Sequence, residues 1–150
     1  MIHGLWNSSS IFSSITSKLD DIGIEYFAPT LKHSYGMTSI IDLTYTLNDL
    51  ILEKYGLEKE LDILGFSMGG IIGRNWIQKF NGYERTRRFI SVGSPHKGTL
   101  IAQIVPKYPF RGISEMKINS KFLRELADND FFLDDIELSL IHISEPTRPY

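Results

Sequence analysis

The segment Leu61-Asp62-Ile63-Leu64-Gly65-Phe66-Ser67-Met68-Gly69-Gly70 decides the fold. A short apolar run ends in a serine between glycines, G-x-S-x-G, and a helical pattern follows. Such a segment is typical of a nucleophile elbow, where a strand turns sharply into a helix and the serine hydroxyl projects from the backbone. Glycine is expected at positions 65 and 69 because side chains there would collide with the turn and its neighbours. The pattern also arises by chance, so the surrounding segments must support this interpretation.

Length and composition restrict the classes of protein to consider. The chain has 150 residues, 42% of them apolar and 23% charged, with a formal net charge of −2. These values are ordinary for one soluble globular domain or part of one, and the bulk charge indicates neither nucleic acid nor an anionic membrane as a partner. The absence of cysteine excludes disulfides, thiolate metal ligands and a cysteine nucleophile. No metal site and no cofactor are predicted, and the oligomeric state is not indicated.

The N-terminal residues carry no targeting signal. Met1-Ile2-His3-Gly4 lacks the charged start and apolar stretch of a signal peptide, which makes the cytoplasm the default location. No run of about 18 apolar residues occurs, so no transmembrane segment is expected. Met1 and Ile2 look like the last two residues of a strand. Because a buried strand normally has about 4 to 8 residues, we expect the N-terminus to be truncated or the start codon to be assigned late.

Apolar periodicity predicts alternating strands and helices. Helices are expected over residues 10–22, 39–55, 68–80 and 119–127, and strands over residues 24–27, 61–66 and 89–92. This alternation predicts an α/β fold with a parallel sheet and helices on both faces. Ligands of such sheets bind at the carboxyl ends of the strands, where Leu5, Ser67 and Gly93 all fall.

Three segments together resemble a known family. They are His3-Gly4-Leu5-Trp6, the elbow from Gly65 to Gly70, and Ser91-Val92-Gly93-Ser94-Pro95-His96-Lys97-Gly98-Thr99. With their spacing they resemble the α/β-hydrolase superfamily, in particular small bacterial lipases and esterases, over most of residues 1–137. The resemblance implies a carboxylic ester hydrolase that uses serine, an acid and histidine, in that chain order, on an ester or lipid substrate. A thioesterase or acyltransferase of the same fold, or a non-catalytic binding protein, stays open as an alternative.

Within this pattern, Ser67 is the predicted nucleophile. The backbone NH groups of Leu5 and Met68 are predicted to form the oxyanion hole. A phosphate-binding role for the glycines is disfavoured, because neither G-K-S/T nor a full G-x-G-x-x-G is present. Trp6 and Phe66 are candidate pocket residues, and both also fit a core.

The histidines and acids do not complete a triad in the sequence. We expect His3 to shape the oxyanion loop, His96 to stabilise a turn and His33 to be solvated. The remaining candidates are Asp128, Asp130, Asp134 and Asp135 with His142. We expect no strand to fit in the seven residues from Asp135 to His142, and we interpret the acidic cluster as solvated surface. The triad acid and histidine are therefore predicted to be absent from this chain.

The C-terminal tail has a different character. Residues 138–150 look like translated adapter read-through, the alternative being a disordered tail. The expected organisation is a partial α/β-hydrolase domain at 1–137, lacking its C-terminal strands, followed by a non-native or disordered tail at 138–150. The apolar segment 100–110 is a candidate lid or acyl-pocket wall. The arginines at 85, 87 and 88 are interpreted as solvated, with phospholipid headgroups as the alternative.

Overall fold

The computed structural model describes residues 1–141. Along the chain, the elements are η1 Ser9–Phe12, α1 Ser13–Asp21, η2 Ser34–Gly36, α2 Ile40–Tyr55, β1 Leu61–Phe66, α3 Met68–Lys79, η3 Gly82–Glu84, β2 Thr86–Val92, α4 Leu100–Gln103, α5 Arg111–Glu115, α6 Lys121–Ala127, η4 Asp130–Leu133 and β3 Glu137–Ile141.

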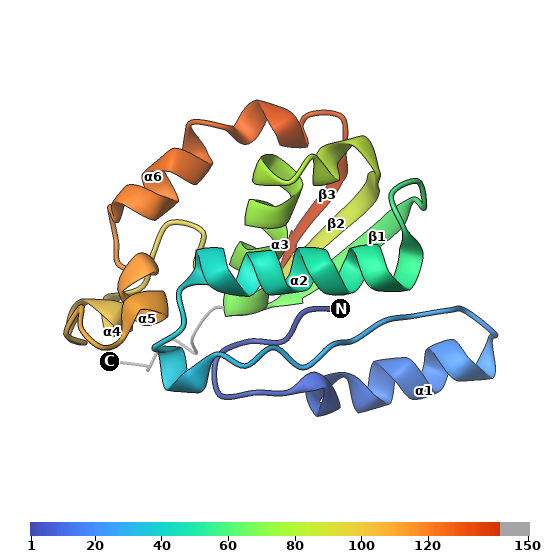
Figure 1. Ribbon diagram of the computed structural model, residues 1–150, viewed down its shortest axis with the longest axis horizontal. Helices are drawn as coiled ribbons and strands as arrows, with labels where there is room; N and C mark the ends of the chain where they lie inside the picture. Colours follow the sequence, from blue (N-terminus) through green and yellow to red (C-terminus); the bar gives the residue numbers. More distant parts are fainter. Residues whose placement is uncertain (142–150) are drawn as a thin grey trace, which may run out of the picture.

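The centre of the fold is a parallel sheet in the order β1-β2-β3 (Figure 1). Ile2 adds a parallel bridge to Gly65 on the free edge of β1. Its NH donates to Leu64 O at 2.8 Å, and its carbonyl accepts from Phe66 N at 2.9 Å. The prediction that Met1 and Ile2 resemble a strand end is thus confirmed by the position of Ile2.

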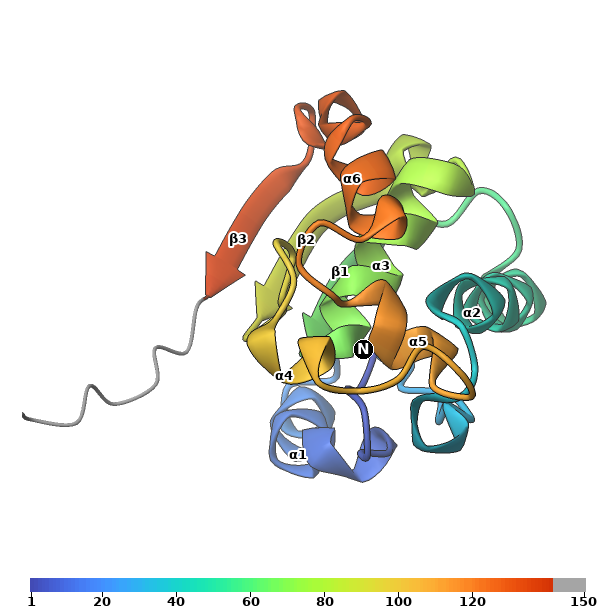
Figure 2. The same cartoon turned by 90° about the vertical axis from the view of Figure 1, so that its left-hand side faces the viewer.

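Helix α3 lies between the sheet and α2, and it carries the largest share of the core. Every residue of α3 from Met68 to Gln78 is buried, because β1 and β2 cover one side of it and α2 covers another. Gly73 permits the close approach, since a Cβ there would lie 3.2 Å from side chains of Ile2, Ile63 and Phe89. The glycine thus lets α3 pack closely against the sheet, and Figure 2 shows this helix beside β1 and β2.

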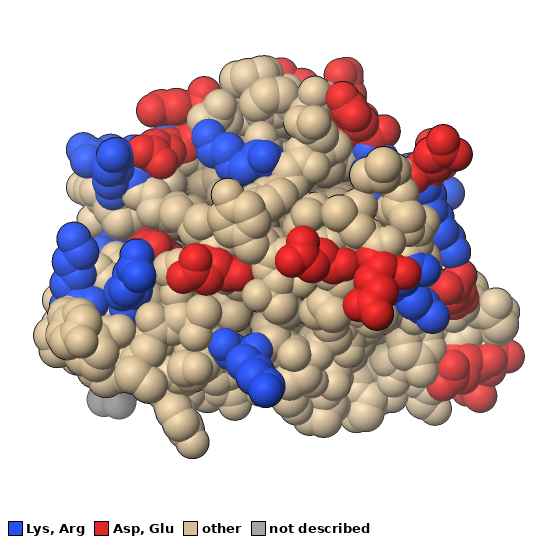
Figure 3. All heavy atoms as spheres, in the orientation of Figure 1, with Lys and Arg blue, Asp and Glu red and all other residues tan. Residues whose placement is uncertain are grey.

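Helix α2 begins and ends where its sequence predicts. The Ser39 hydroxyl accepts from Asp42 N at 3.0 Å as an N-cap, and Gly56, with φ of 68°, ends the helix. One stripe of the helix is buried against α3, and Figure 3 shows acidic side chains along its outer face. Strong periodicity with both caps present made this helix predictable over its full length.

The two faces of the sheet are covered unequally. Ile63 and Phe89 face α3 and are buried, whereas the register places Leu64, Ile90 and Val92 on the opposite face, where they are only half-buried. Helix α1 contributes no buried residue. Within residues 1–141, helices therefore cover one face of the sheet more completely than the other.

One prediction of secondary structure was wrong, and two other elements differ from their predicted form or bounds. Residues 24–27 form no strand, because a ladder needs a neighbouring strand alongside, and this segment instead accepts a bond from the Met1 ammonium at Phe27 O, 2.6 Å long. The helix expected over 10–22 is divided into the 3-10 turn η1 and α1, with Ser8 as the cap of the turn. Strand β2 begins at Thr86, three residues earlier than expected.

Strand β3 begins one residue before the expected tail. Residues 138–141 continue this strand and pair in parallel with residues 89–92 of β2. All five of its residues are exposed. The boundary proposed at residue 137 therefore falls inside a strand, and residues 142–150 lie outside the described part of the chain.

Candidate active site

Ser67 occupies a strained backbone conformation between β1 and α3. Its φ of 53° and ψ of −124° lie in a region that residues other than glycine rarely adopt. Such a conformation costs about 1–3 kcal/mol and persists only where the surroundings hold it. Here Ser67 N donates to Val92 O at 2.9 Å, and Gly70 N donates to Ser67 O at 3.1 Å. The segment thus has the sharp strand-to-helix turn that its sequence predicts.

The glycines flanking Ser67 are required by close backbone contacts. A Cβ at Gly65 would lie 2.6 Å from Gly70 N, and a Cβ at Gly69 would lie 2.6 Å from His3 O and closer still to Ile2 O. Neither obstacle is a flexible side chain that can move away. The prediction that side chains at positions 65 and 69 would collide with the turn and its neighbours is confirmed.

The His-Gly turn packs directly against the serine. A Cβ at Gly4 would lie 2.8 Å from Ser67 Cβ and 3.3 Å from Ser67 Oγ. This contact brings the amides of Leu5 and Met68 to the same edge of the sheet as the Ser67 hydroxyl. Neither amide donates a hydrogen bond to any group within residues 1–141. Two unpaired NH donors beside a serine hydroxyl are able to bind an oxyanion, although their role stays a prediction.

His3 fixes the position of this turn. Its side chain is 1% exposed, its Nε2 accepts from Leu31 N at 2.8 Å, and its Nδ1 lies 2.9 Å from Gly4 O. Because Nε2 must accept, we assign the proton to Nδ1, which donates to Gly4 O. Burial lowers the pKa of His3, the bond to Gly4 opposes this shift, and the nearby His33 adds to it. A neutral His3 in a fixed tautomer agrees with the predicted shaping of the oxyanion loop.

The other two histidines of the described part are also engaged. His33 is half-buried, packs edge-on against His3 with ring centroids 6.0 Å apart, and contacts Asn7 O through Nε2 at 3.3 Å. The expectation of a solvated His33 was therefore wrong. His96 Nε2 lies 2.7 Å from Ser91 Oγ, which agrees with a turn-stabilising position. The sequence offered no signal for the His3–His33 pair, because the two residues are far apart along the chain.

The Ser67 hydroxyl makes no hydrogen bond to a histidine or carboxylate within residues 1–141. His142 lies outside the described residues. Strand β3 occupies positions 137–141, so the expectation that no strand fits between Asp135 and His142 was wrong: only three residues separate the turn η4 from this strand. Since β3 is parallel to β2, Asp134 and Asp135 lie at the opposite edge of the sheet from Ser67.

One member of the acidic cluster has a buried partner. Asp130 accepts hydrogen bonds from Arg74 Nη2 and, at 3.3 Å, from Gln78 Nε2. Arg74 is 6% exposed, and a buried guanidinium needs such a counter-charge. Asp130 itself is exposed, as predicted for this cluster, but its contact with the buried Arg74 was not predicted.

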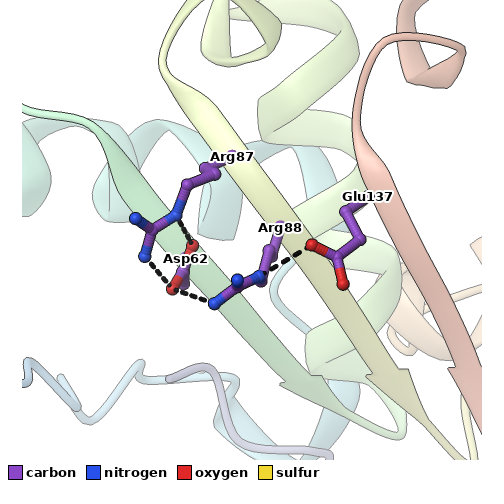
Figure 4. A network of polar contacts seen from close by, with 4 residues as sticks. All are labelled: Asp62, Arg87, Arg88 and Glu137. Carbon is purple, nitrogen blue, oxygen red and sulfur yellow. Dashed lines mark hydrogen bonds and ion pairs between the residues drawn. The ribbon is translucent and has the colours of Figure 1, made fainter.

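The arginines that precede β2 are held by ionic and polar contacts. Arg87 bonds both carboxylate oxygens of Asp62, at 3.0 and 2.7 Å, and Arg88 donates to Glu137 at 2.8 Å (Figure 4). Arg85 donates to the carbonyl oxygens at positions 56 and 59. Arg87 lowers the pKa of Asp62 through their hydrogen bond. These contacts tie the three strands together at the edge opposite Ser67. Arg87 and Arg88 are exposed, as predicted, and their charges are also paired, whereas Arg85 is half-buried.

Two kinds of feature are missing from the described residues. No group of three or more His, Asp or Glu side chains within 1–141 is placed to hold a metal ion. No helix in this part of the chain is long and apolar enough to cross a bilayer. Of the two candidate pocket residues, Trp6 is 67% exposed and so is not a core residue, while Phe66 is half-buried.

Solved structures with the same architecture define the class. The mature lipase BlEst2 of Bacillus licheniformis matches with a TM-score of 0.67 and 17% identity, covering 93% of this chain and 62% of that one. Phospholipase PlaB of Legionella pneumophila matches at 0.62 and 14%, over 93% and 37%. An extracellular alpha/beta-hydrolase from a Paenibacillus species matches at 0.56 and 21%, over 86% and 51%. The chain thus has the α/β-hydrolase fold and spans less than two thirds of the length of these structures.

The family follows from a separate comparison. A family model described as palmitoyl protein thioesterase matches residues 1–137. The chain belongs to the palmitoyl protein thioesterase family, a group of α/β-hydrolases related to lipases and esterases. No curated protein matches the chain significantly.

Proposed function

We propose that this chain provides the nucleophile and oxyanion hole of a serine hydrolase that cleaves carboxylic esters. The observation that carries the proposal is the strained conformation of Ser67, with φ of 53° and ψ of −124°, at the end of a parallel strand. Strain of this kind collects at sites where it has a function, because an ordinary βα turn can relax it. The family match and the unpaired amides of Leu5 and Met68 support the same assignment.

In the proposed reaction, Ser67 Oγ attacks the acyl carbonyl carbon. The negative charge then develops on the carbonyl oxygen, where the NH groups of Leu5 and Met68 would stabilise it. The serine proton must pass to a base and then to the leaving alcohol, and water must hydrolyse the acyl-serine. Because no histidine bonds Ser67 within residues 1–141, we propose that the base and acid lie outside this part of the chain and that the 150-residue product turns over slowly, if at all.

A thioester substrate is the second candidate. It is favoured by the match to palmitoyl protein thioesterase over residues 1–137. Both substrates would use the same Ser67 and the same two amides, because the oxyanion forms on the carbonyl oxygen in either case. The two candidates differ only in the leaving group, so rates on a matched fatty-acyl oxoester and thioester would separate them.

The test is labelling of the 150-residue chain with a fluorophosphonate, followed by mass spectrometry. An oxyanion hole accelerates acyl transfer by roughly 10³ to 10⁴ over water even without a triad. We therefore expect slow labelling at Ser67 alone, abolished in Ser67→Ala and unchanged in Ser10→Ala, whose serine is exposed but unstrained. Turnover of a short-chain nitrophenyl ester should stay near background.

Equal labelling of several serines, or none at Ser67, would contradict the assignment of the nucleophile and favour a non-catalytic binding protein. Rapid ester turnover that depends on Ser67 would support the nucleophile but overturn the proposal that the activating groups are missing.

A further inference from the structure

The segment around α4 exposes an unusual concentration of large apolar side chains. Leu100, Ile101, Ile104 and Tyr108 are 75%, 65%, 84% and 85% exposed, and we refer to these four as the apolar rim. Single exposed apolar side chains are normal in soluble proteins. Four within nine consecutive residues form a cluster, and clusters of this kind mark interaction surfaces.

The apolar rim is held in place by a buried inner side of the same segment. Ala102 is 1% exposed, and Ile113 and Met116 are also buried in the core. Thr99 N donates to Met116 O at 3.0 Å, and the Thr99 hydroxyl caps α4. Ala102, Ile113 and Met116 thus pack into the core, while the four side chains of the apolar rim face solvent.

This surface lies at the end of the molecule that carries Ser67. Helix α5 contacts both α4 and η2, and Ile113 of α5 packs against Gly36, which in turn faces the Leu5 side chain. Figures 1 and 2 show α4, α5 and η2 together at one end. Two further exposed aromatic residues belong to the neighbouring segments, Trp6 after the oxyanion loop and Tyr35 in η2. Aromatic side chains with one polar atom suit the boundary between water and lipid.

The charge of this region differs from that of the whole chain. Residues 96–116 contain Lys97, Lys107 and Arg111 and one acid, the half-buried Glu115 of α5, whereas the chain as a whole has a net charge of −2. All three cations are exposed. Over the end where α4 and α5 lie, Figure 3 shows mainly basic and uncharged side chains. Basic residues next to exposed apolar residues are the combination that binds an anionic lipid surface.

We propose that the apolar rim, with Lys97, Lys107 and Arg111, is a docking surface for an anionic phospholipid bilayer. A second copy of the chain fits this surface less well, because pairing two copies would bring like charges together. Docking in this orientation would hold the Ser67 edge of the sheet near the membrane. The proposal does not depend on ester hydrolysis, because binding to vesicles can be measured without a nucleophile.

The test is co-sedimentation with vesicles of phosphatidylcholine containing phosphatidylserine at about three parts in ten, using Ser67→Ala protein so that no lipid is cleaved. We expect binding to these vesicles, weaker binding to pure phosphatidylcholine, and loss of binding as salt is raised. Ile101→Ser with Ile104→Ser should reduce partitioning about tenfold or more, since two apolar side chains no longer enter the interface. Lys107→Glu with Arg111→Glu should reduce it about as strongly.

Matched controls come from the rest of the surface. Leu57 is 76% exposed on the connection before β1, and Leu57→Ser should leave partitioning unchanged. Lys121 of α6 has an 86% exposed side chain, and Lys121→Glu should have a smaller effect than the charge reversal at Lys107 and Arg111. Unchanged circular dichroism would show that each variant is folded, as expected for exposed positions.

Tryptophan fluorescence gives an independent readout. Trp76 is 1% exposed and Trp6 is 67% exposed, so any shift of emission on adding vesicles reports on Trp6. We expect a blue shift with the phosphatidylserine vesicles and none in the Ile101→Ser, Ile104→Ser variant. The proposal is overturned if protein with an unsubstituted apolar rim does not bind these vesicles. It is also overturned if the rim variants bind as well as that protein, or if the substitutions change only the oligomeric state.

Discussion

The sheet has one edge at the carboxyl ends of its strands, where Ser67 lies, and another at their amino ends. These two edges are stabilised in opposite ways. At the Ser67 edge, backbone segments pack so closely that Gly4, Gly65 and Gly69 cannot carry a side chain, and two amides lack partners within residues 1–141. At the other edge, half-exposed charged side chains connect the three strands, as Asp62 and Arg87 do (Figure 4). Steric fit at the first edge leaves no room for adjustment, whereas exposed ion pairs can rearrange with little loss. Substitutions should therefore be severe at the Ser67 edge and mild at the other.

The largest effect is expected from Gly69→Ala. The new Cβ would collide with the carbonyl oxygens of Ile2 and His3, which are backbone atoms and cannot swing away. We expect a loss of about 3 kcal/mol or more in the free energy of unfolding, measured by urea denaturation. Gly23→Ala is the matched control: nothing lies near its Cβ, so only its positive φ of 68° should cost about 1 kcal/mol. Equal losses in the two variants would contradict the steric argument.

A smaller effect is expected at His3. His3→Ala removes the partner of Leu31 N, whereas Gly4 O keeps its bond from Asn7 N at 3.3 Å, and one buried group left unpaired costs about 1–3 kcal/mol. The wild type should also lose stability in mild acid. The pKa of folded His3 is lowered, so the stabilising neutral form is fully present above the unfolded pKa of about 6.5 and lost as the pH falls through the folded pKa. Unfolding free energies measured from pH 8 downward should show a slope below about pH 6.5 that is reduced in His3→Ala. An unchanged slope would show that another group causes it.

The smallest effect is expected at the opposite edge, in Asp62→Asn. This change removes the bond with Arg87, and because both side chains are largely exposed it should cost less than about 1 kcal/mol. The pKa of Asp62 is lowered in the folded state, so its contribution is present above the unfolded pKa of about 3.9 and is lost as the pH falls through the folded pKa. The free energies of unfolding of Asp62→Asn and wild type should therefore differ at neutral pH. They should converge once the pH has fallen below the folded pKa of Asp62. Asp49→Asn, at an exposed position of α2 with no ion pair within residues 1–141, should be neutral.

Local signals in the sequence were enough to predict the centre of the fold. β1, α2 and α3 each carry a complete periodic pattern, and caps or glycines mark their ends, so these elements have the predicted bounds within one residue. The close approach at Gly65 and Gly69 was also predictable, because only glycine fits such a turn. The nucleophile turn was therefore predictable from residues adjacent in the chain.

Features that depend on distant residues were missed. Strand pairing decides whether residues 24–27 and 137–141 form strands, and their composition gave the wrong answer in both cases. Asp130 reaches back 56 positions to Arg74, and His3 reaches forward 28 positions to Leu31. Periodicity carries no information about such contacts, because it reports only which face of an element is apolar.

The hydrogen bond from Leu31 N to His3 also closes a long loop of the chain, from residue 3 to residue 31. The residues between these two anchors include η1 and α1, and α1 buries none of its side chains. The cost of closing such a loop grows slowly with its length. This stretch is therefore where insertions, deletions or a grafted peptide would be tolerated best, since the oxyanion turn is positioned by the two ends of the loop.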